Sequence, residues 1–265
     1  MKFVRFSNNR NEEPTAPPGT PGVHWGVWED GKIRTIEGTP FGHYHVTGQG
    51  MAADEVRLLP PCYPSKIVCV GRNYVEHAKE LDHDVPTEPL IFFKPPSAIV
   101  TDGDVVIYPP DSSRLDHEGE VGIVIGRRMR HLGPQESAAG YILGFTCVND
   151  VTARDLQKKD GQWTRGKGFD TFCSFGPCIA TGLDASDLEV KCYLNGQLKQ
   201  QGHVRNMIFN FDVVLRFISR VMTLEPGDVI ATGTPAGVGP MKVGDTVEVV
   251  IEGIGTLRNV IGVTA

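Results

Sequence analysis

Two acidic residues stand one residue apart directly before a strongly apolar segment, and they are the first candidates for chemistry. Glu118 and Glu120 lie in the segment HEGEVGIVIG, which runs from residue 117 to residue 126. In a β-strand, residues i and i+2 point to the same face, so the two carboxylates are expected to project together. Like charges that lose their hydration at a buried strand end need a cation or a shared proton. The spacing therefore predicts a site for a hard divalent metal ion.

A third acidic residue, Asp150, ends the apolar segment FTCVND, where a strand is expected to stop and a helix to begin. Asp is also a preferred N-cap residue, so a capping role is the alternative interpretation. If Asp150 joins the two glutamates, the ligands are all oxygen atoms. Mg²⁺ prefers such a ligand set, with Mn²⁺ or Ca²⁺ as substitutes, whereas zinc would favour His or Cys.

The helix expected at residues 151–159 carries a second polar pair. Arg154 and Gln157 are three residues apart and so share one face, where they could bind a carboxylate together. The alternative is a solvated helix on which Arg154 pairs with Asp155 or Asp160.

A candidate proton-transfer pair follows the strand expected at residues 66–71. His77 and Glu80 lie one turn apart on a short predicted helix, where the carboxylate can orient the imidazole and raise its basicity. Pairs with this spacing are also common on exposed helices, so a surface pair is the alternative.

Two glycine-rich segments lack the features of nucleotide-binding loops. The segment GQWTRGKG begins like a phosphate loop, but Gly168 stands where Ser or Thr would ligate magnesium. The segment at residues 232–240, TGTPAGVGP, has no dinucleotide fingerprint. We interpret it as a tight loop whose amides and hydroxyls could meet a ligand.

Alternating apolar residues and frequent turn signals predict a mainly β protein of the α+β class. The dipeptide Asn195-Gly196 predicts a β-hairpin, because a type I′ turn needs positive φ at both positions. A core-packing helix is expected at residues 211–222, where apolar residues recur at helical spacing. Strands are expected at residues 2–6, 23–28, 32–36, 66–71, 90–93, 104–107, 118–125, 141–148, 175–180, 188–194, 246–251 and 256–263.

A proline cluster divides the chain into two parts whose sequence patterns differ. Pro60, Pro61 and Pro64 precede a strongly β-patterned segment. The prediction is a small N-terminal β-rich domain at residues 1–60 and a catalytic domain at residues 61–265.

Composition excludes several classes of function. The net charge of −6 and the pI near 5.8 argue against a nucleic-acid partner. No apolar run approaches the roughly 18 to 20 residues of a membrane span, and the start of the chain does not resemble a signal peptide, so a cytoplasmic location is expected. The six cysteines form no CxxC pair and are expected to be reduced.

Five segments together resemble the fumarylacetoacetate hydrolase family, specifically its shorter members. They occur in family order over residues 61–265 and read VGRNYVEHAKE, HEGEVGIVIG, NDVTARDLQ, WTRGKGFDTFCSFGP and GDVIATGTPAGVG. The resemblance implies a mixed β-sandwich roll with a small N-terminal domain, assembled as a homodimer. A fold-level expectation of this kind is analogy.

The resemblance also implies roles for individual residues. Glu118, Glu120 and Asp150 would be the metal ligands. His77 and Glu80 would form a catalytic pair on a lid that orders over the substrate, with Lys167 also catalytic. The residues expected to bind substrate are Arg72, Arg154, Gln157 and Thr234. Larger family members supply a further aspartate ligand upstream of the histidine; here that stretch is VGRNY, so fumarylacetoacetate itself is not the expected substrate.

The functional hypothesis is a magnesium-dependent enzyme that acts on enolisable 2-oxo acids in aromatic catabolism. The substrate would chelate Mg²⁺ through its 2-oxo oxygen and C1 carboxylate, and Lys167 would stabilise the developing negative charge. The expected type is a 2-hydroxyhepta-2,4-diene-1,7-dioate isomerase or 5-oxopent-3-ene-1,2,5-tricarboxylate decarboxylase. The alternatives are an acylpyruvate C–C hydrolase of the fumarylpyruvate type, an oxaloacetate decarboxylase, and a non-catalytic metal-dependent ligand-binding relative.

Overall fold

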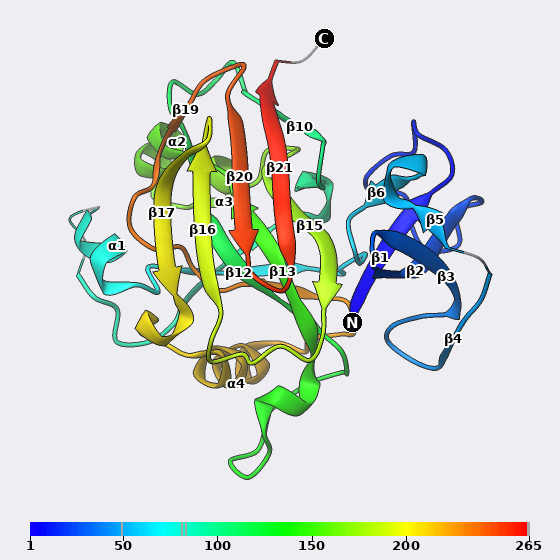
Figure 1. Cartoon of the computed structure of the whole chain (residues 1–265). Helices are drawn as coiled ribbons and strands as arrows, with labels where there is room; N and C mark the ends of the chain where they lie inside the picture. Colours follow the sequence, from blue (N-terminus) through cyan, green and yellow to red (C-terminus); the bar gives the residue numbers. More distant parts are fainter. Residues whose placement is uncertain (49, 81, 83, 264–265) are drawn as a thin grey trace.

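The structure is a computed structural model that describes residues 1–48, 50–80, 82 and 84–263. Most of its regular elements are strands, arranged in three sheets, so the mainly β prediction is confirmed (Figure 1). The helices are α1 (Val75–Glu80), α2 (Arg154–Asp160), α3 (Thr164–Lys167) and α4 (Phe211–Val221), and the 3-10 turns are η1 (Ala53–Glu55), η2 (Pro96–Ala98), η3 (Ala138–Tyr141) and η4 (Val204–Asn206).

The largest sheet runs through the whole molecule in the order β4-β3-β2-β1-β15-β13-β12-β18-β7-β8, with β5, β6 and β9 attached to its side. Its strands are β1 (Lys2–Ser7), β2 (Val23–Glu29), β3 (Lys32–Gly38), β4 (Tyr44–Val46), β5 (Met51–Ala52), β6 (Arg57–Leu59), β7 (Ile67–Gly71), β8 (Leu90–Lys94), β9 (Ile99–Val100), β12 (Gly119–Ile125), β13 (Ile142–Asp150), β15 (Cys173–Ala180) and β18 (Val229–Ala231).

A second sheet, in the order β10-β21-β20-β16-β17, packs against the middle of the first (Figure 1). Alternate residues of β20 are buried, as expected of a strand with one face toward a core, whereas every residue of β12 is buried. Its strands are β10 (Val105–Ile107), β16 (Glu189–Leu194), β17 (Gln197–His203), β20 (Thr246–Ile251) and β21 (Gly255–Gly262). A small third sheet joins β14 (Thr152–Ala153), β11 (Leu115–His117) and β19 (Gly239–Met241).

The N-terminal strands continue the large sheet, because β1 pairs with β2 on one side and with β15 on the other. The register of the second pairing places Lys2 opposite Ala180. Figure 1 shows β1 to β6 gathered at one end of the molecule. The predicted division near residue 61 stays a prediction.

Two local predictions near the acidic residues are wrong. The helix expected at residues 151–159 begins only at Arg154, because Thr152 and Ala153 pair with β11 as a short strand. Asp150 is therefore the last residue of β13, and the N-cap is Ala153. Glu118 was expected within a strand, but it lies in a one-residue break between β11 and β12.

Among the helices that the structure describes, none is long and apolar enough to cross a membrane.

The predicted hairpin is confirmed, and it provides a test of the fold. Asn195 and Gly196 connect β16 to β17 with φ values of 51° and 74°. Replacing Gly196→Ala places a side chain in the left-handed region, although no atom lies within 4 Å of the new Cβ. We expect a loss of about 1 kcal/mol in the free energy of unfolding, measured by urea denaturation.

The control for this prediction is Gly42→Ala. That glycine has no positive φ, and the atom nearest to an added Cβ is 3.9 Å away. Its unfolding free energy should stay unchanged or rise slightly, because alanine restricts the unfolded chain. An equal loss in both variants would contradict the turn assignment.

Candidate active site

The three predicted metal ligands converge at the middle of the large sheet. One carboxylate oxygen from each of Glu118, Glu120 and Asp150 lies within 4.8 Å of the others, and all three residues are buried. The pairing of β12 with β13 produces this arrangement, since Gly119 lies opposite Asn149. The Asp150 amide donates a hydrogen bond of 2.9 Å to the Glu118 carbonyl, which fixes the ends of the two strands together.

Buried cations surround these carboxylates. The Lys167 Nζ atom donates to Glu118 Oε2 at 2.8 Å and to Asp150 Oδ2 at 2.6 Å. Arg154 donates to Glu118 Oε1 and, at 2.9 Å, to Asp116 Oδ2. Every one of these contacts forms between side chains that are almost completely buried, so each is strong and each is costly to leave incomplete.

A buried lysine leaves one of the acidic oxygens without a hydrogen bond. Lys94 Nζ donates to the carbonyls of Val151, Lys167 and Phe172 at 2.9, 2.6 and 2.7 Å. An ammonium group has three protons, and these contacts use all of them. Asp150 Oδ1 lies 2.7 Å from the same nitrogen as an ion pair but accepts no aligned hydrogen bond. This oxygen therefore keeps its lone pairs for another partner.

The charge count of the cluster also fits a divalent cation. Four buried carboxylates, those of Asp116 and the three predicted ligands, face three buried cations, Lys94, Arg154 and Lys167. The buried groups alone carry one excess negative charge when all are ionised, and the partly exposed Arg114, which pairs with Asp116 at 2.9 Å, offsets it from the solvent side. A divalent ion would change this excess to one positive charge, which suits an anionic substrate. The donor set, all oxygen, fits Mg²⁺ as the sequence predicted.

The acidic groups differ strongly in their affinity for protons. Burial and the neighbouring charges of Asp150 and Glu118 raise the pKa of Glu120 well above its usual range, although the Gly233 amide donates to it at 2.7 Å. Burial also opposes ionisation of Glu118, but the charges of Lys167 and Arg154 outweigh burial and lower its pKa. Glu120 is therefore the predicted ligand at which a proton and a metal ion would compete.

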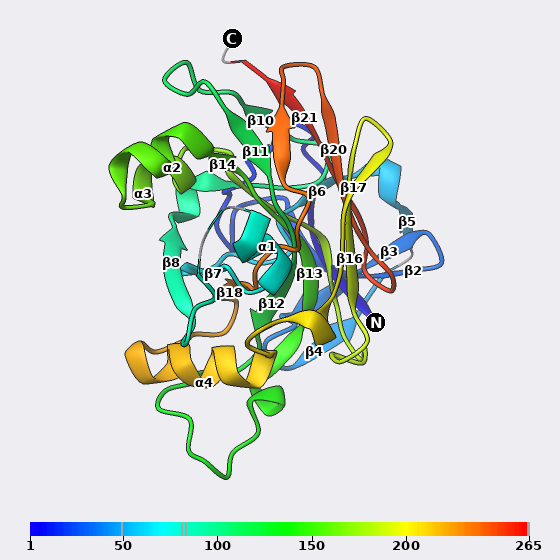
Figure 2. The same ribbon diagram turned by 90° about the vertical axis from the view of Figure 1, so that its left-hand side faces the viewer.

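The predicted proton-transfer pair lies on α1, which follows β7 (Figure 2). His77 Nδ1 is 3.4 Å from Glu80 Oε2, and Glu80 in turn accepts hydrogen bonds from the Gly237 amide at 3.0 and 3.2 Å. Burial lowers the pKa of His77, which keeps the imidazole neutral near pH 7. When Nδ1 donates to Glu80, Nε2 is left as the proton acceptor.

A cavity of about 280 Å³ brings the predicted site residues together. Glu80 is the exception, because it stands behind His77 and contacts Gly237 instead. Gln157 accepts a hydrogen bond of 2.7 Å from Arg154, so the pair expected on one helix face is formed. The members that line the cavity are Arg72, His77, Glu118, Glu120, Asp150, Arg154, Gln157, Lys167 and Thr234. Their catalytic and binding roles stay predictions.

The loop after β18 also contributes to the cavity. Thr234 donates to the Gly119 carbonyl at 2.9 Å and accepts from the Gln200 amide at 2.6 Å. With the Gly233 amide on Glu120, this loop meets the site through amides and a hydroxyl, as the sequence indicated.

Sequence reasoning missed four residues of the site: Lys94, Asp116, Phe92 and Trp163. A lysine that ends the apolar strand LIFFK was a usable signal, because a charged residue in such a strand needs a buried partner. Trp163 lies in the glycine-rich segment that was considered only as a phosphate loop and rejected as one. It packs edge-on against Phe92, with ring centres 5.1 Å apart.

A mainly β fold with an acidic, metal-competent cavity defines the class of protein, and comparisons with known proteins identify the family. A family model described as fumarylacetoacetate (FAA) hydrolase C-terminal matches residues 66–262, and one described as Rv2993c-like, N-terminal matches residues 1–61. The chain therefore belongs to the fumarylacetoacetate hydrolase family, whose members are enzymes, as the five sequence segments predicted.

Solved structures and curated relatives agree with this assignment. The crystal structure of 2-hydroxyhepta-2,4-diene-1,7-dioate isomerase from Mycobacterium marinum is 42% identical, with a TM-score of 0.87 over 100% of this chain and 99% of that chain. The 5-carboxymethyl-2-hydroxymuconate delta-isomerase from Mycobacterium smegmatis is 41% identical, with a TM-score of 0.87 over 100% of both chains. The human oxaloacetate tautomerase FAHD2A, mitochondrial, is 42% identical over 214 residues, 76% of this chain and 68% of the human protein.

Competition between a proton and a metal ion at Glu120 predicts a pH-dependent stability. Without metal, the raised pKa of Glu120 means that the folded protein keeps a proton that the unfolded chain releases above about pH 4.3. Stability of the metal-free protein should therefore fall as pH rises from that value toward the raised pKa. Added Mg²⁺ should raise the melting temperature more at about pH 8 than at about pH 5. At the higher pH a smaller fraction of Glu120 carries a proton that the ion must displace.

The variant Glu120→Gln tests the origin of this effect by thermal denaturation. It should lose most of the stabilisation by Mg²⁺ and most of the dependence of the metal-free protein on pH. Glu13→Gln, which changes an exposed carboxylate to which no described residue donates a hydrogen bond, is the matched control and should behave as the wild type. Equal Mg²⁺ stabilisation of both variants at both pH values would contradict the assignment of Glu120 as a ligand.

Proposed function

We propose that this protein is a divalent-metal-dependent tautomerase or isomerase that moves a proton between carbon and oxygen in an enolisable 2-oxo acid. The observation that carries the proposal is the meeting, in one cavity, of three metal-competent carboxylates with a neutral histidine. The relatives support it, since those named above are two isomerases and an oxaloacetate tautomerase. We propose Mg²⁺ as the metal because the donors are carboxylate oxygens.

Charge stabilisation is the first task of the site. Glu118, Glu120 and Asp150 would hold the cation, which when bound supplies Lewis acidity that stabilises the negative charge of an enolate. Lys167 and Arg154 add two fixed positive charges at the same end of the cavity. Because these groups are already held by buried hydrogen bonds, they need little reorganisation when negative charge develops.

Proton transfer is the second task. His77 is neutral and lines the cavity, so its Nε2 atom can take a proton from the carbon next to the 2-oxo group and return it to oxygen. Glu80 orients the ring and stabilises the imidazolium that forms. Phe92 and Trp163 provide an apolar wall that limits access of water to the enolate.

A 2-oxo-acid enolate also forms in two other reactions, so they are the second candidates. Loss of CO₂ from a 2-oxo diacid and C–C cleavage of an acylpyruvate each release such an enolate as the product, and the relatives' names favour the proton shift. A role in the catabolism of aromatic compounds and a homodimeric assembly remain predictions.

Metal removal tests the proposal directly. Purified protein treated with EDTA should lose at least about 100-fold in the rate of keto–enol interconversion of oxaloacetate, followed by the absorbance of the enol. Mg²⁺ should restore the rate. The control Glu13→Gln should keep full activity and full dependence on Mg²⁺, whereas Glu118→Gln should be inactive with and without it.

Two results would refute this assignment. One is an unchanged rate in protein whose metal content has been measured as zero. The other is a rise in melting temperature with ligand and no turnover of any 2-oxo acid, which would identify a binding protein. Release of CO₂ or of pyruvate faster than enol formation would move the assignment to decarboxylation or hydrolysis.

Replacement of the histidine tests the proton-transfer role. His77→Asn should lower kcat for tautomerisation by about 10²- to 10⁴-fold, because general acid–base catalysis supplies a factor of that size. The exchange of substrate C–H for deuterium, followed by NMR, should fall by the same factor. Since the pKa of His77 is lowered, activity should decline only at pH values below the usual range of a histidine.

His203→Asn is a matched control, because His203 also lies 3.4 Å from a carboxylate, that of Asp187, but outside the cavity. It should leave both rates unchanged. Deuterium exchange that persists at the wild-type rate in His77→Asn would assign the base elsewhere.

A further inference from the structure

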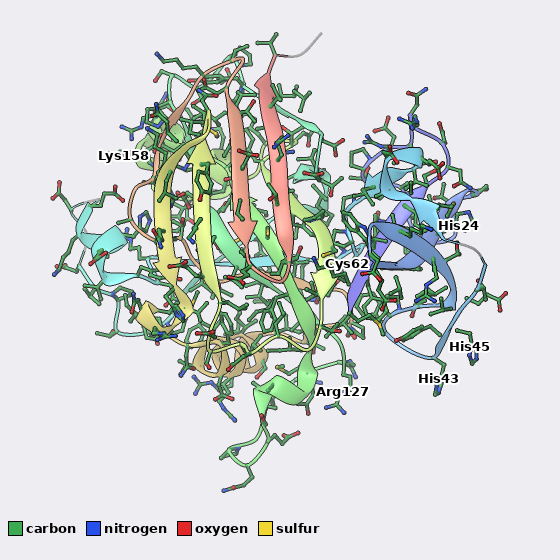
Figure 3. All side chains as sticks on the ribbon, in the orientation of Figure 1. His24, His43, His45, Cys62, Arg127 and Lys158 are labelled. Carbon is green, nitrogen blue, oxygen red and sulfur yellow. The ribbon has the colours of Figure 1, made fainter. Side chains whose placement is uncertain are left out.

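The edge strand of the second sheet carries a polar side chain at a buried position. Gln200 of β17 is 1% exposed, whereas its neighbours Lys199 and Gln201 are exposed. A primary amide that is taken out of water needs partners for all of its hydrogen-bonding groups. Figures 1 and 3 show β17 on the same side of the molecule as Lys158 of α2, which lines the cavity. Gln200 is therefore expected to have specific partners beneath the sheet edge.

The carbonyl end of the Gln200 amide bridges the break in which Glu118 lies. Its Oε1 atom accepts a hydrogen bond of 3.0 Å from the Gly119 amide and lies 2.9 Å from His117 Nδ1. These two residues precede and follow Glu118 in the chain. Glu118 belongs to neither β11 nor β12, so regular strand pairing does not extend through it. Gln200 thus holds both neighbours of a predicted metal ligand in place.

The amino end of the same amide holds the loop that carries Thr234. Its Nε2 atom donates to Thr234 Oγ1 at 2.6 Å and to the Pro235 carbonyl at 2.8 Å. The loop lies close against β17, because a Cβ added to Gly202 of that strand would be 2.5 Å from the Pro235 side chain. One side chain therefore connects two walls of the cavity, the wall with Glu118 and the wall with Thr234.

The backbone partners of the amide determine which atom carries each proton. The Gly119 amide can only donate and the Pro235 carbonyl can only accept, so the orientation of the Gln200 amide is fixed. Because Oε1 carries no proton, His117 donates to it from Nδ1. Thr234 accepts from Nε2 and donates its own proton to the Gly119 carbonyl at 2.9 Å. All four hydrogen-bonding positions of the amide are used, and Thr234 can only accept from a ligand.

We propose that Gln200 is a positioning residue, which sets the direction of the Glu118 carboxylate and of the Thr234 hydroxyl through its four hydrogen bonds. This inference deepens the proposed function and rests on it, since it concerns the same metal site. Gln200 is not among the residues that line the cavity, so it acts on the cation and on the substrate only through its neighbours. Loss of a group that orients a metal ligand lowers metal affinity by about 10- to 100-fold.

Metal binding by the variant Gln200→Met tests the contact with the strand break. Methionine has a similar length but lacks the amide. We expect its Kd for Mn²⁺, measured from the EPR signal of the free ion, to be about 10- to 100-fold higher than that of the wild type. Wild-type protein that binds no Mn²⁺ would overturn this proposal together with the proposed function.

Gln201→Met is the matched control, because Gln201 is the next residue of β17 but is exposed and donates to Glu189 at 2.8 Å. It should keep the wild-type Kd for Mn²⁺. Equal dissociation constants of Gln200→Met and Gln201→Met would overturn the proposal. A weaker affinity of Gln200→Met alone, in a protein without turnover of any 2-oxo acid, would refute the proposed function and still support Gln200 as a positioning residue of the metal site.

A double-variant comparison tests the contact with the loop. Thr234→Val keeps the shape of the side chain, removes the hydroxyl and should leave the Kd for Mn²⁺ within about threefold of the wild type. At saturating Mn²⁺, Gln200→Met should lower kcat/KM by a smaller factor in the Thr234→Val background than in the wild type, because the shared contact is already lost. Equal factors in the two backgrounds would overturn the part of the proposal that concerns Thr234.

A measurement on the wild type keeps the proposal testable if Gln200→Met does not fold. Nitrogen NMR of the isotope-labelled, metal-free protein should show His117 protonated at Nδ1, because the amide orientation requires it. Both Nε2 protons of Gln200 should exchange slowly with solvent, since each is buried in a hydrogen bond. A His117 ring protonated only at Nε2, or rapid exchange of the Gln200 amide protons, would overturn the proposal.

Discussion

The crowding of four carboxylates in the buried interior is the constraint on which the site depends. Four carboxylates and three cations occupy a region where water is excluded, and each unpaired charge there carries a large desolvation cost. Lys94 donates its three protons to carbonyl groups, so it cannot also donate a hydrogen bond to Asp150 Oδ1. A divalent cation would offset the mutual repulsion of the carboxylates and bind the unsatisfied oxygen. The polypeptide thus folds around a position that its own side chains leave incomplete.

The topology of the sheets places these charges with little freedom. The carboxylates come from the paired ends of β12 and β13, so their separation is fixed by strand spacing. Arg154 and Lys167 come from α2 and α3, the two short helices that follow β13. The short pairing of Thr152 and Ala153 with β11 delays the first helix by one turn. Asp150 is consequently not needed as a helix cap, and its carboxylate is left for the cluster.

Sequence patterns predicted those parts of the structure that depend on near neighbours. The strands, the Asn195-Gly196 hairpin and the shared face of Arg154 and Gln157 follow from periodicity and turn chemistry. The resemblance to the family then predicted that the separate acidic segments form one site. The convergence of Glu118 with Glu120 agrees with the expected i, i+2 spacing. Glu118 itself lies in a break between β12 and β11, and β11 pairs with β14 on one side and with β19 on the other.

Contacts over long sequence separations account for the residues that were missed. Lys94 contacts Asp150, 56 positions away, and the carbonyls that bind it lie on three different segments. No local pattern encodes such partners. Trp163 likewise lines the cavity only where the fold brings it against Phe92 of β8. Polar and aromatic residues of this kind depend on tertiary structure that propensity does not describe.

The segment that carries His77, the proposed proton acceptor, is anchored at both ends. Arg72 and His77 are joined by Asn73, whose side chain donates to the Thr232 and Phe209 carbonyls and accepts from the Phe209 amide at distances of 2.8 to 3.0 Å. This clamp fixes the start of the segment, and the contact between Glu80 and the Gly237 amide fixes its end. The imidazole of His77 is thus held beside the cavity by anchors on both sides of it in the chain. Proton transfer from a bound substrate would depend on this fixed position, because a small misplacement of a catalytic group costs a large factor in rate.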